Sequence, residues 1–284
     1  LPKSLLNYSI LLAMLAVVFF VAESKYPLHL GKVSRKTWIL DLTYFYLAMV
    51  VTSVVLLLVI NITGTAMNAL GPMPWHSWVA QLSQSWAFVA SILVTEIAYY
   101  WVHRIAHQVP FFWRFHAVHH SSPQMYWLCA SRTHPLDLSF FRAFVFVCLY
   151  VVGFGHGGAE SRAASFAGYA LWMTVWSYLM HANIRLRLGW LEYVVASTAF
   201  HHWHHVKGDP ALVDKNYSAN FPFMDLLFGT FYLPKKEWPK QYGIDDELAP
   251  SLWGQLLDPL RGRNVMQIGP TAWRNQSLER LPQR

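Results

Sequence analysis

The stretch His103–His120 reads HRIAHQVPFFWRFHAVHH and places five histidines within eighteen residues. It directly follows an apolar run that is long enough to cross a membrane. Residues three or four apart lie on one face of a helix, so His103 and His107 point the same way. The other three histidines repeat that spacing; they are His116, His119 and His120. Each group therefore presents several imidazole nitrogens to one point.

A second H-x-x-H-H pattern lies in the run HHWHH, at His201, His204 and His205. A single histidine such as His29 is more often a satisfied polar residue than a ligand. A repeated pattern is different, because unliganded rings held together would charge and repel near pH 6.5, whereas neutral imidazole is the commonest metal ligand. The repeat therefore indicates a metal site.

The composition is that of a membrane protein. The chain is 55% hydrophobic and only 13% charged, against about a quarter charged in soluble proteins. Cys129 and Cys148 are too few for a disulfide framework or an iron–sulfur cluster. The net charge of +7 is spread between the apolar runs, which favours attraction to anionic lipid headgroups over nucleic acid.

The apolar runs predict an all-α, polytopic membrane protein with about four to five spans. We expect one membrane domain over residues 1–284, with N-terminal spans in 1–95, a histidine-rich catalytic region in 96–233 and a cytoplasmic tail in 234–284. The expected spans are residues 5–21, 38–62 and 86–102; residues 136–154 and 163–180 either cross as two further spans or form a re-entrant hairpin.

Charge asymmetry predicts the orientation. The loop over residues 23–36 carries four basic residues, whereas residues 63–85 contain no Lys or Arg. By the positive-inside rule the first loop is cytoplasmic. The third span then delivers His103 to the cytoplasmic face. The two later apolar stretches place HHWHH on the same side, whether both cross or they form a hairpin. We expect a site facing the cytoplasm, in a bacterial inner membrane or the endoplasmic reticulum.

Glu96 is an ionisable residue inside the third span, seven positions before His103. Such residues are functional candidates by default. The sequence is equally consistent with a structural role, in which the Glu96 carboxylate pairs with Tyr99, Tyr100 or a neighbouring helix.

The histidines are too many for one ion. Catalytic zinc usually takes three protein ligands and structural zinc four, so eight to ten donors fit two metals. Imidazole suits zinc, copper, iron and nickel, and ligand type alone does not choose among them. The candidates are His103, His107, His116, His119, His120, His201, His204 and His205, with His134 and His181 near the ends of later spans.

Six segments in order resemble a known family. They are EIAYYWVHRIAH, FHAVHHSSPQM, SRTHPLD, MHAN, FHHWHH and NYSANFPFMDLLFGTFY, covering residues 96–232. Together they resemble the fatty acid hydroxylase and sterol desaturase superfamily. The resemblance implies an integral membrane enzyme with a histidine-bound di-iron centre on the cytoplasmic side, which uses O₂ and two external electrons to hydroxylate or desaturate lipids and sterols.

The resemblance also assigns residues. It implies all ten candidate histidines as ligands, with His202 as a possible substitute for a neighbour. Glu96, Asn216 and Asp225 are the further residues expected at the catalytic site. Among carboxylates that accept an N–H from a ligating imidazole, Asp225 is expected first and Asp137 next, whereas Asp209 and Asp214 are expected to be solvated. Tyr126 and Ala199 depart from the family pattern. These departures leave the metal ligands intact, but the resemblance does not identify the substrate.

The function expected is that of a membrane di-iron monooxygenase that hydroxylates a sterol or fatty-acyl lipid. An alkyl C–H bond cannot be broken by proton transfer to or from a side chain, so an oxidising metal is required. Iron is expected, although zinc readily occupies histidine sites in a purified sample. The chain has no dinucleotide fingerprint or ferredoxin cysteines, so a ferredoxin, reductase or b-type cytochrome is expected as electron donor.

Three alternatives remain open. A desaturase would use the same centre. A metal carrier or transporter would hold its histidines along a path near the membrane midplane. A haem-binding electron carrier needs only two axial histidines.

Overall fold

The computed structural model describes residues 2–154, 159–208, 211–245 and 248–262. All regular elements in these ranges are helices. In chain order they are α1 (Pro2–Lys25), α2 (Arg35–Leu70), α3 (His76–Gln81), α4 (Gln84–Gln108), α5 (Pro110–His120), η1 (Trp127–Ser131), α6 (Pro135–Val152), α7 (Ala159–His181), η2 (Gly189–Tyr193), α8 (Thr198–His204), α9 (Phe223–Phe228) and α10 (Leu252–Arg261).

Four helices of the described chain are long and apolar enough to cross a membrane, namely α1, α2, α4 and α6. They confirm the predicted all-α fold and identify an integral membrane protein. The fifth apolar run, residues 163–180, lies in the helix α7 but is not among these four. Small and polar residues within it, such as Gly168 and Thr174, lower its hydropathy.

The helix α2 extends beyond the predicted span of residues 38–62. It begins at the cap Ser34, whose side chain accepts from the Thr37 backbone N–H at 3.1 Å, and it ends at Gly71, where φ is 76°. The polar residues after position 60 lower the hydropathy without breaking the helix, whereas Gly71 followed by proline ends it. Thirty-six residues span about 54 Å, more than the ~30 Å hydrocarbon layer.

The bundle is held together around α6, which packs against both α2 and α4. A second core joins α1 to η1, where Phe19 stacks on Trp127 with ring centroids 5.9 Å apart. A buried ion pair fastens α2 to the segment after η1: Arg132 Nε lies 2.6 Å from Asp41 Oδ1, and the Tyr126 hydroxyl donates to the other carboxylate oxygen. Tyr126, which departs from the family pattern, therefore has a structural contact.

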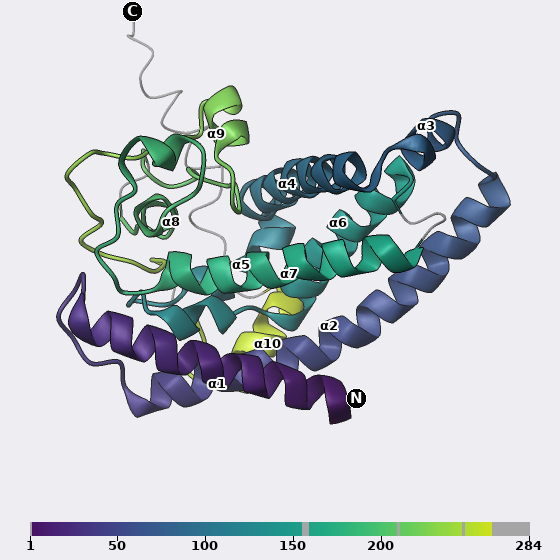
Figure 1. Ribbon diagram of the computed structural model, residues 1–284. Coiled ribbons are helices and arrows are strands. Elements are labelled where there is room, and N and C mark those ends of the chain that lie inside the picture. The colour runs from purple at the N-terminus through teal and green to yellow at the C-terminus, as the bar shows by residue number, and fades with distance from the viewer. Residues whose placement is uncertain (1, 155–158, 209–210, 246–247, 263–284) are drawn as a thin grey trace, which may run out of the picture.

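The helices α8 and α9 and their loops gather at one end of the long helices, opposite the end where α3 joins α2 to α4 (Figure 1). The basic loop after α1 is bonded to this same end. The backbone N–H of Leu28 donates to the Asn183 carbonyl at 3.1 Å, and Asn183 Nδ2 donates to the His29 carbonyl at 2.9 Å. The positively charged first loop and the HHWHH segment therefore lie on one side of the bundle.

Candidate metal centre

Two consecutive helices carry the first five histidines. His103 and His107 lie one turn apart on the buried face of α4, with ring centroids 5.1 Å apart. Pro110 starts α5 at a position where its missing N–H costs nothing, and the chain turns back. The helix α5 then directs His116 toward His107, with ring centroids 4.9 Å apart. The spacing in the sequence thus becomes one convergent face.

The remaining ligand candidates come from α7 and α8. His181 ends α7, and Ser197 caps α8 by accepting from the Phe200 backbone N–H at 3.2 Å. This short helix presents His201 and His204 to the histidines of α4 and α5; the His103 and His204 rings lie 4.5 Å apart.

The structure sorts nine of the ten predicted histidines into two groups. In each group the ligand atoms lie within 4.8 Å of one another. The five-histidine group is His103, His107, His116, His120 and His204; the four-histidine group is His119, His181, His201 and His205. All nine are buried except His119, which is half-buried. Two groups of this size agree with the predicted count of two metals.

Outer hydrogen bonds orient the five-histidine group. His103 Nδ1 donates to the Tyr217 carbonyl at 2.7 Å, and His204 Nδ1 donates to the Lys215 carbonyl at 2.7 Å. A carbonyl only accepts, so it fixes the proton on Nδ1 and leaves Nε2 with a free lone pair. The Nε2 atoms of all five rings are buried without a hydrogen-bond partner in the described part of the chain. Buried polar atoms are rarely left unpaired, and a metal ion would satisfy all five.

In the four-histidine group, two imidazole nitrogens face each other in a contact that a bound cation would explain. His181 Nδ1 donates to the Ser177 carbonyl at 2.7 Å, and His119 Nδ1 donates to the Arg132 carbonyl at 3.2 Å. Neutral imidazole has one N–H, so both Nε2 atoms carry lone pairs, yet they face each other at 3.2 Å. Two ligands about 2.1 Å from one ion are held at about this separation. The pair therefore fits a shared metal and not a hydrogen bond.

Burial keeps these rings in the ligand form. It lowers the pKa of His204 to about 3, and burial together with the neighbouring histidines lowers the pKa of His119, His120, His201 and His205 well below the usual value. The rings are then neutral at pH 7, which is the form that binds metals.

His134, the tenth predicted ligand, lies apart from both groups. It caps α6: its Nδ1 accepts from the Leu136 backbone N–H at 3.1 Å, and its Nε2 donates to the Leu256 carbonyl at 3.1 Å. Both nitrogens of His134 have hydrogen-bond partners and the residue lies in neither histidine group, so these contacts do not support the predicted ligand role. His202 also points elsewhere, toward the Tyr242 hydroxyl and the Ala182 carbonyl, and it does not replace a neighbour.

The carboxylates that hold the imidazoles are Asp137 and Asp214. Asp137 Oδ2 accepts from His116 Nδ1 at 3.0 Å, as the sequence suggested. Asp214 Oδ1 accepts from His107 Nδ1 at 3.1 Å, although it was expected to be solvated. No sequence signal distinguishes Asp214 from Asp209, which lies outside the described residues; Asp214 adopts φ of 64°, and burial raises its pKa to about 6.

Asp225 plays a different part from the one predicted. Its oxygens accept from the backbone N–H groups of Tyr217 and Ser218, each at 2.8 Å, and from Thr230 Oγ1 at 2.6 Å. None of its partners in the described part of the chain is an imidazole. Asp225 acts indirectly, because the Tyr217 carbonyl that it helps to place receives the N–H of His103.

Glu96 and Asn216, the other predicted catalytic residues, also form hydrogen bonds with backbone groups. The Glu96 carboxylate accepts from the Asn220 and Phe221 N–H groups at 3.1 and 3.2 Å, and from the Tyr169 hydroxyl. Asn216 Nδ2 donates to the carbonyls of Phe200 and Tyr232, each at 2.8 Å. These contacts give both residues a positioning role, and their catalytic role stays a prediction.

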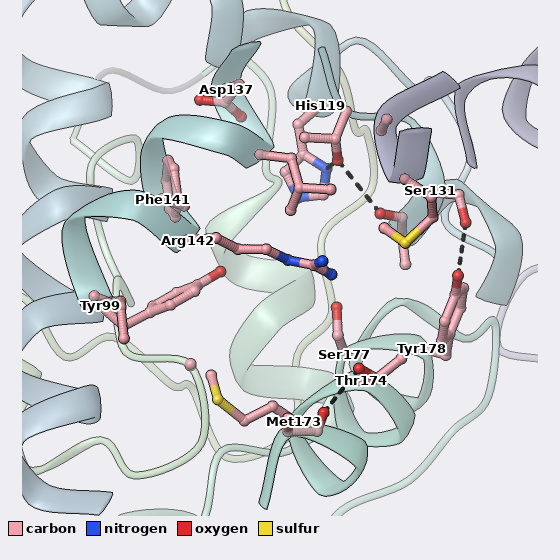
Figure 2. Close-up of a pocket in the computed structure, with 18 of the residues that line it drawn as sticks. Tyr99, His119, Ser131, Asp137, Phe141, Arg142, Met173, Thr174, Ser177 and Tyr178 are labelled. Carbon is pink, nitrogen blue, oxygen red and sulfur yellow. Dashed lines mark hydrogen bonds between the residues drawn. The ribbon is translucent and has the colours of Figure 1, made fainter. Parts of the chain in front are cut away.

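A cavity of about 670 Å³ adjoins the histidines. Its walls are mostly apolar side chains of α1, α2, α4, α6 and α7, and five histidines line it: His103, His116, His119, His181 and His201. Both histidine groups contribute to this lining. Figure 2 shows Arg142 extending from α6 into the cavity, with His119 and Tyr99 among its other lining residues.

Arg142 was missed by the sequence reasoning. The signal was present, because Arg142 interrupts the apolar run 136–154 just as Glu96 interrupts the third span. Its neighbour Phe141 stacks on His116 with ring centroids 5.3 Å apart, so this turn of α6 lies directly against the five-histidine group.

The matched protein family agrees with this geometry. The sequence model of the fatty acid hydroxylase family matches residues 88–230, just over half of the chain and all nine clustered histidines. The chain belongs to the fatty acid hydroxylase family. The predicted superfamily is thereby confirmed.

Curated relatives of this fatty acid hydroxylase family member carry hydroxylase or monooxygenase names. The ornithine lipid hydroxylase OlsE of Rhizobium tropici is 28% identical over 193 residues, which is 68% of this chain and 56% of the relative. The alkylglycerol monooxygenase of Xenopus tropicalis is 27% identical, over 58% of this chain and 33% of the relative. That of Homo sapiens is 26% identical, over 56% and 32%. The chain thus spans between about a third and just over half of these relatives, and no solved structure matches it significantly.

Proposed function

We propose that this protein is a membrane di-iron hydroxylase that uses O₂ and two electrons to hydroxylate a lipid. The observation that carries the proposal is the apolar cavity lined by both histidine groups. A cavity with such walls suits an alkyl chain, and its histidine end is where a metal would meet that chain. The names of the relatives, an ornithine lipid hydroxylase and alkylglycerol monooxygenases, support a lipid substrate.

The nine clustered histidines would hold two irons, one in each group. The bound irons supply the activation of O₂ that an alkyl C–H bond requires, since no side chain of the protein can break that bond by acid–base chemistry. The haem alternative needs two axial histidines and leaves seven of these nine without a role. A metal carrier explains the histidines but not the apolar cavity beside them.

The chain's own residues position the ligands and exclude water. Asp137 and Asp214 hold the N–H groups of His116 and His107, and backbone carbonyls hold those of His103 and His204. These contacts fix ring orientation and tautomer. The apolar cavity walls align a substrate chain beside the histidines and keep bulk water from the reacting carbon.

Hydroxylation is favoured over desaturation by the names of the relatives. Both outcomes start with removal of a hydrogen from the substrate chain, so the site geometry serves either. Product analysis separates them, since hydroxylation adds one oxygen atom and desaturation removes two hydrogens.

The site is proposed to face the cytoplasm. The basic loop after α1 is bonded to the end of the bundle that carries α8, and basic loops are retained in the cytoplasm. A separate donor would deliver electrons there. The exposed Lys235 and Lys236 are proposed to contribute to docking an acidic donor; unchanged turnover and salt dependence after their reversal to Glu would refute this part.

The deciding experiment combines metal analysis with isotope labelling. The protein is purified without added metal, analysed for metals and examined by Mössbauer spectroscopy after growth on enriched iron. We expect two irons per chain, coupled through a bridge, and incorporation of one ¹⁸O atom from ¹⁸O₂ into a lipid when reductant is supplied. An intact sample without stoichiometric metal, or an iron-loaded sample that oxidises no lipid, would overturn the proposal.

A further inference from the structure

Arg142 lies in a mostly apolar cavity and has no ion-pair partner among the described residues. It lines the cavity from α6 (Figure 2). Across the described residues, no carboxylate forms an ion pair with it and no hydrogen bond to its guanidinium is found. The polar side chains that line the cavity with it include the tyrosines Tyr8, Tyr99 and Tyr178. The one carboxylate in this lining, Asp137, accepts from His116 Nδ1 at 3.0 Å and forms no ion pair with Arg142. Arg142 is half-buried, whereas Arg132, which is buried, is paired with Asp41.

An unpaired guanidinium among apolar walls is unfavourable, because burying a charge costs free energy unless a partner compensates it. Charged residues at membrane depth are rare, and they mark substrate or ion sites. The guanidinium offers five N–H donors in a planar fork, which matches a carboxylate or a phosphate in a two-point contact. The chemistry that completes this cavity is therefore an anionic group.

The position of Arg142 relates that anionic group to the histidines. Asp137, five residues earlier on α6, accepts the N–H of His116, and Phe141 stacks on the same ring. Five residues of helix rise about 7.5 Å. Arg142 and the two residues that contact His116 therefore belong to the same one and a half turns of α6.

We propose that Arg142 binds the anionic carboxylate or phosphate of the lipid substrate and so places the alkyl carbons next to that charge against the histidines. The inference rests on the proposed function, since it takes the cavity to be the lipid site. It adds the substrate class, an anionic lipid, and a specificity residue. It also predicts that oxidation occurs in the half of the chain nearer the charged group.

Binding without turnover tests Arg142 directly. Radiolabelled hexadecanoate, hexadecyl phosphate and hexadecan-1-ol share one chain length and differ in the head group. They are titrated against the zinc-loaded full chain in detergent, in wild type and in Arg142→Gln, Arg142→Lys and Arg35→Gln. Arg35 is exposed at the start of α2 and is the matched control. Metal content and thermal melting establish that each variant is folded.

We expect wild type and Arg35→Gln to bind an anionic probe roughly tenfold or more tightly than the alcohol, as for loss of a charge-assisted contact. Arg142→Gln should abolish this preference while leaving the affinity for the alcohol unchanged, and Arg142→Lys should keep part of it, because lysine retains the charge without the fork. The tighter of the two anionic probes identifies carboxylate or phosphate as the natural group.

Equal affinity of wild type for charged and neutral probes overturns the inference, even if no variant folds. A preference that survives in Arg142→Gln also overturns it. In both cases the hydroxylase proposal stands, because it is tested by iron content and ¹⁸O incorporation. Failure of all three probes to bind overturns both, since the cavity would then not take a lipid. Oxidation near the methyl end of the chain overturns the placement of the charged group beside the histidines.

Discussion

Replacing Asp137 by asparagine should weaken metal binding in the five-histidine group without removing a ligand. Asp137 Oδ2 accepts from His116 Nδ1 at 3.0 Å, and the His116 and Asp137 side chains are only 4% and 3% exposed. Asparagine keeps the size of the side chain but loses the negative charge, so a charge-assisted bond becomes neutral. Hydrogen bonds to charged groups contribute about 1.5–3 kcal/mol. A tenfold to hundredfold loss of metal affinity, about 1.4–2.7 kcal/mol, is expected for such outer partners.

The assay is competition for metal against a chelator of known affinity, which reports the affinity directly and does not depend on turnover. Asp245→Asn is the matched control, because Asp245 is half exposed and pairs with Lys207 at the surface. Asp214→Asn should fall between the two, because Asp214 also accepts from a ligating histidine but is 19% exposed, and solvent compensates part of the loss. Wild-type metal affinity in Asp137→Asn, or an equal loss in Asp245→Asn, would refute the reasoning.

The other predictions concern ligands, a buried ion pair and the metal itself. His119→Ala should lose the metal of its group and abolish turnover, whereas His29→Ala should keep both, as measured by metal analysis and O₂ uptake; full activity in His119→Ala would refute the ligand assignment. Arg132→Met should lower the free energy of unfolding by about 3–5 kcal/mol, because it leaves Asp41 buried and unpaired, and a melting temperature equal to that of the wild type would contradict this. Removing the metal with a chelator should lower the melting temperature and metal addition should restore it, because an ion bound only by the folded state stabilises that state; identical melting curves with and without metal would argue against a bound ion.

The helix α6 connects three parts of the proposed mechanism. Its first turn supplies Asp137 to His116, its second turn packs Phe141 on the same ring, and the next residue is Arg142 in the cavity. Because α6 also packs against α2 and α4, a shift of this helix would change metal geometry and substrate position together. Core substitutions along α6 should therefore affect turnover even where they touch no ligand.

Eight of the nine clustered histidines were predictable because their signal is local, whereas His181 was expected from the family resemblance. Spacing of three and four residues places His103 with His107, and His116 with His120, on one helical face whatever the rest of the chain does. The membrane helices were predictable for a similar reason, since apolar length follows from the sequence alone. The extension of α2 to Leu70 was not, because polar residues within a helix lower hydropathy without ending it.

The sequence by itself determined the residue types and their local periods: the apolar helices, the two H-x-x-H-H patterns and hence a metal centre in a membrane protein. Only the tertiary structure decided which nitrogens meet. It separated His119 from its neighbours His116 and His120, used both nitrogens of His134 for helix contacts, and selected Asp214 in place of Asp225 as an imidazole partner. Neighbours in sequence point in different directions around a helix, and a carboxylate's partner depends on backbone packed against it from elsewhere. Such contacts between distant segments are fixed by packing, which no local pattern encodes.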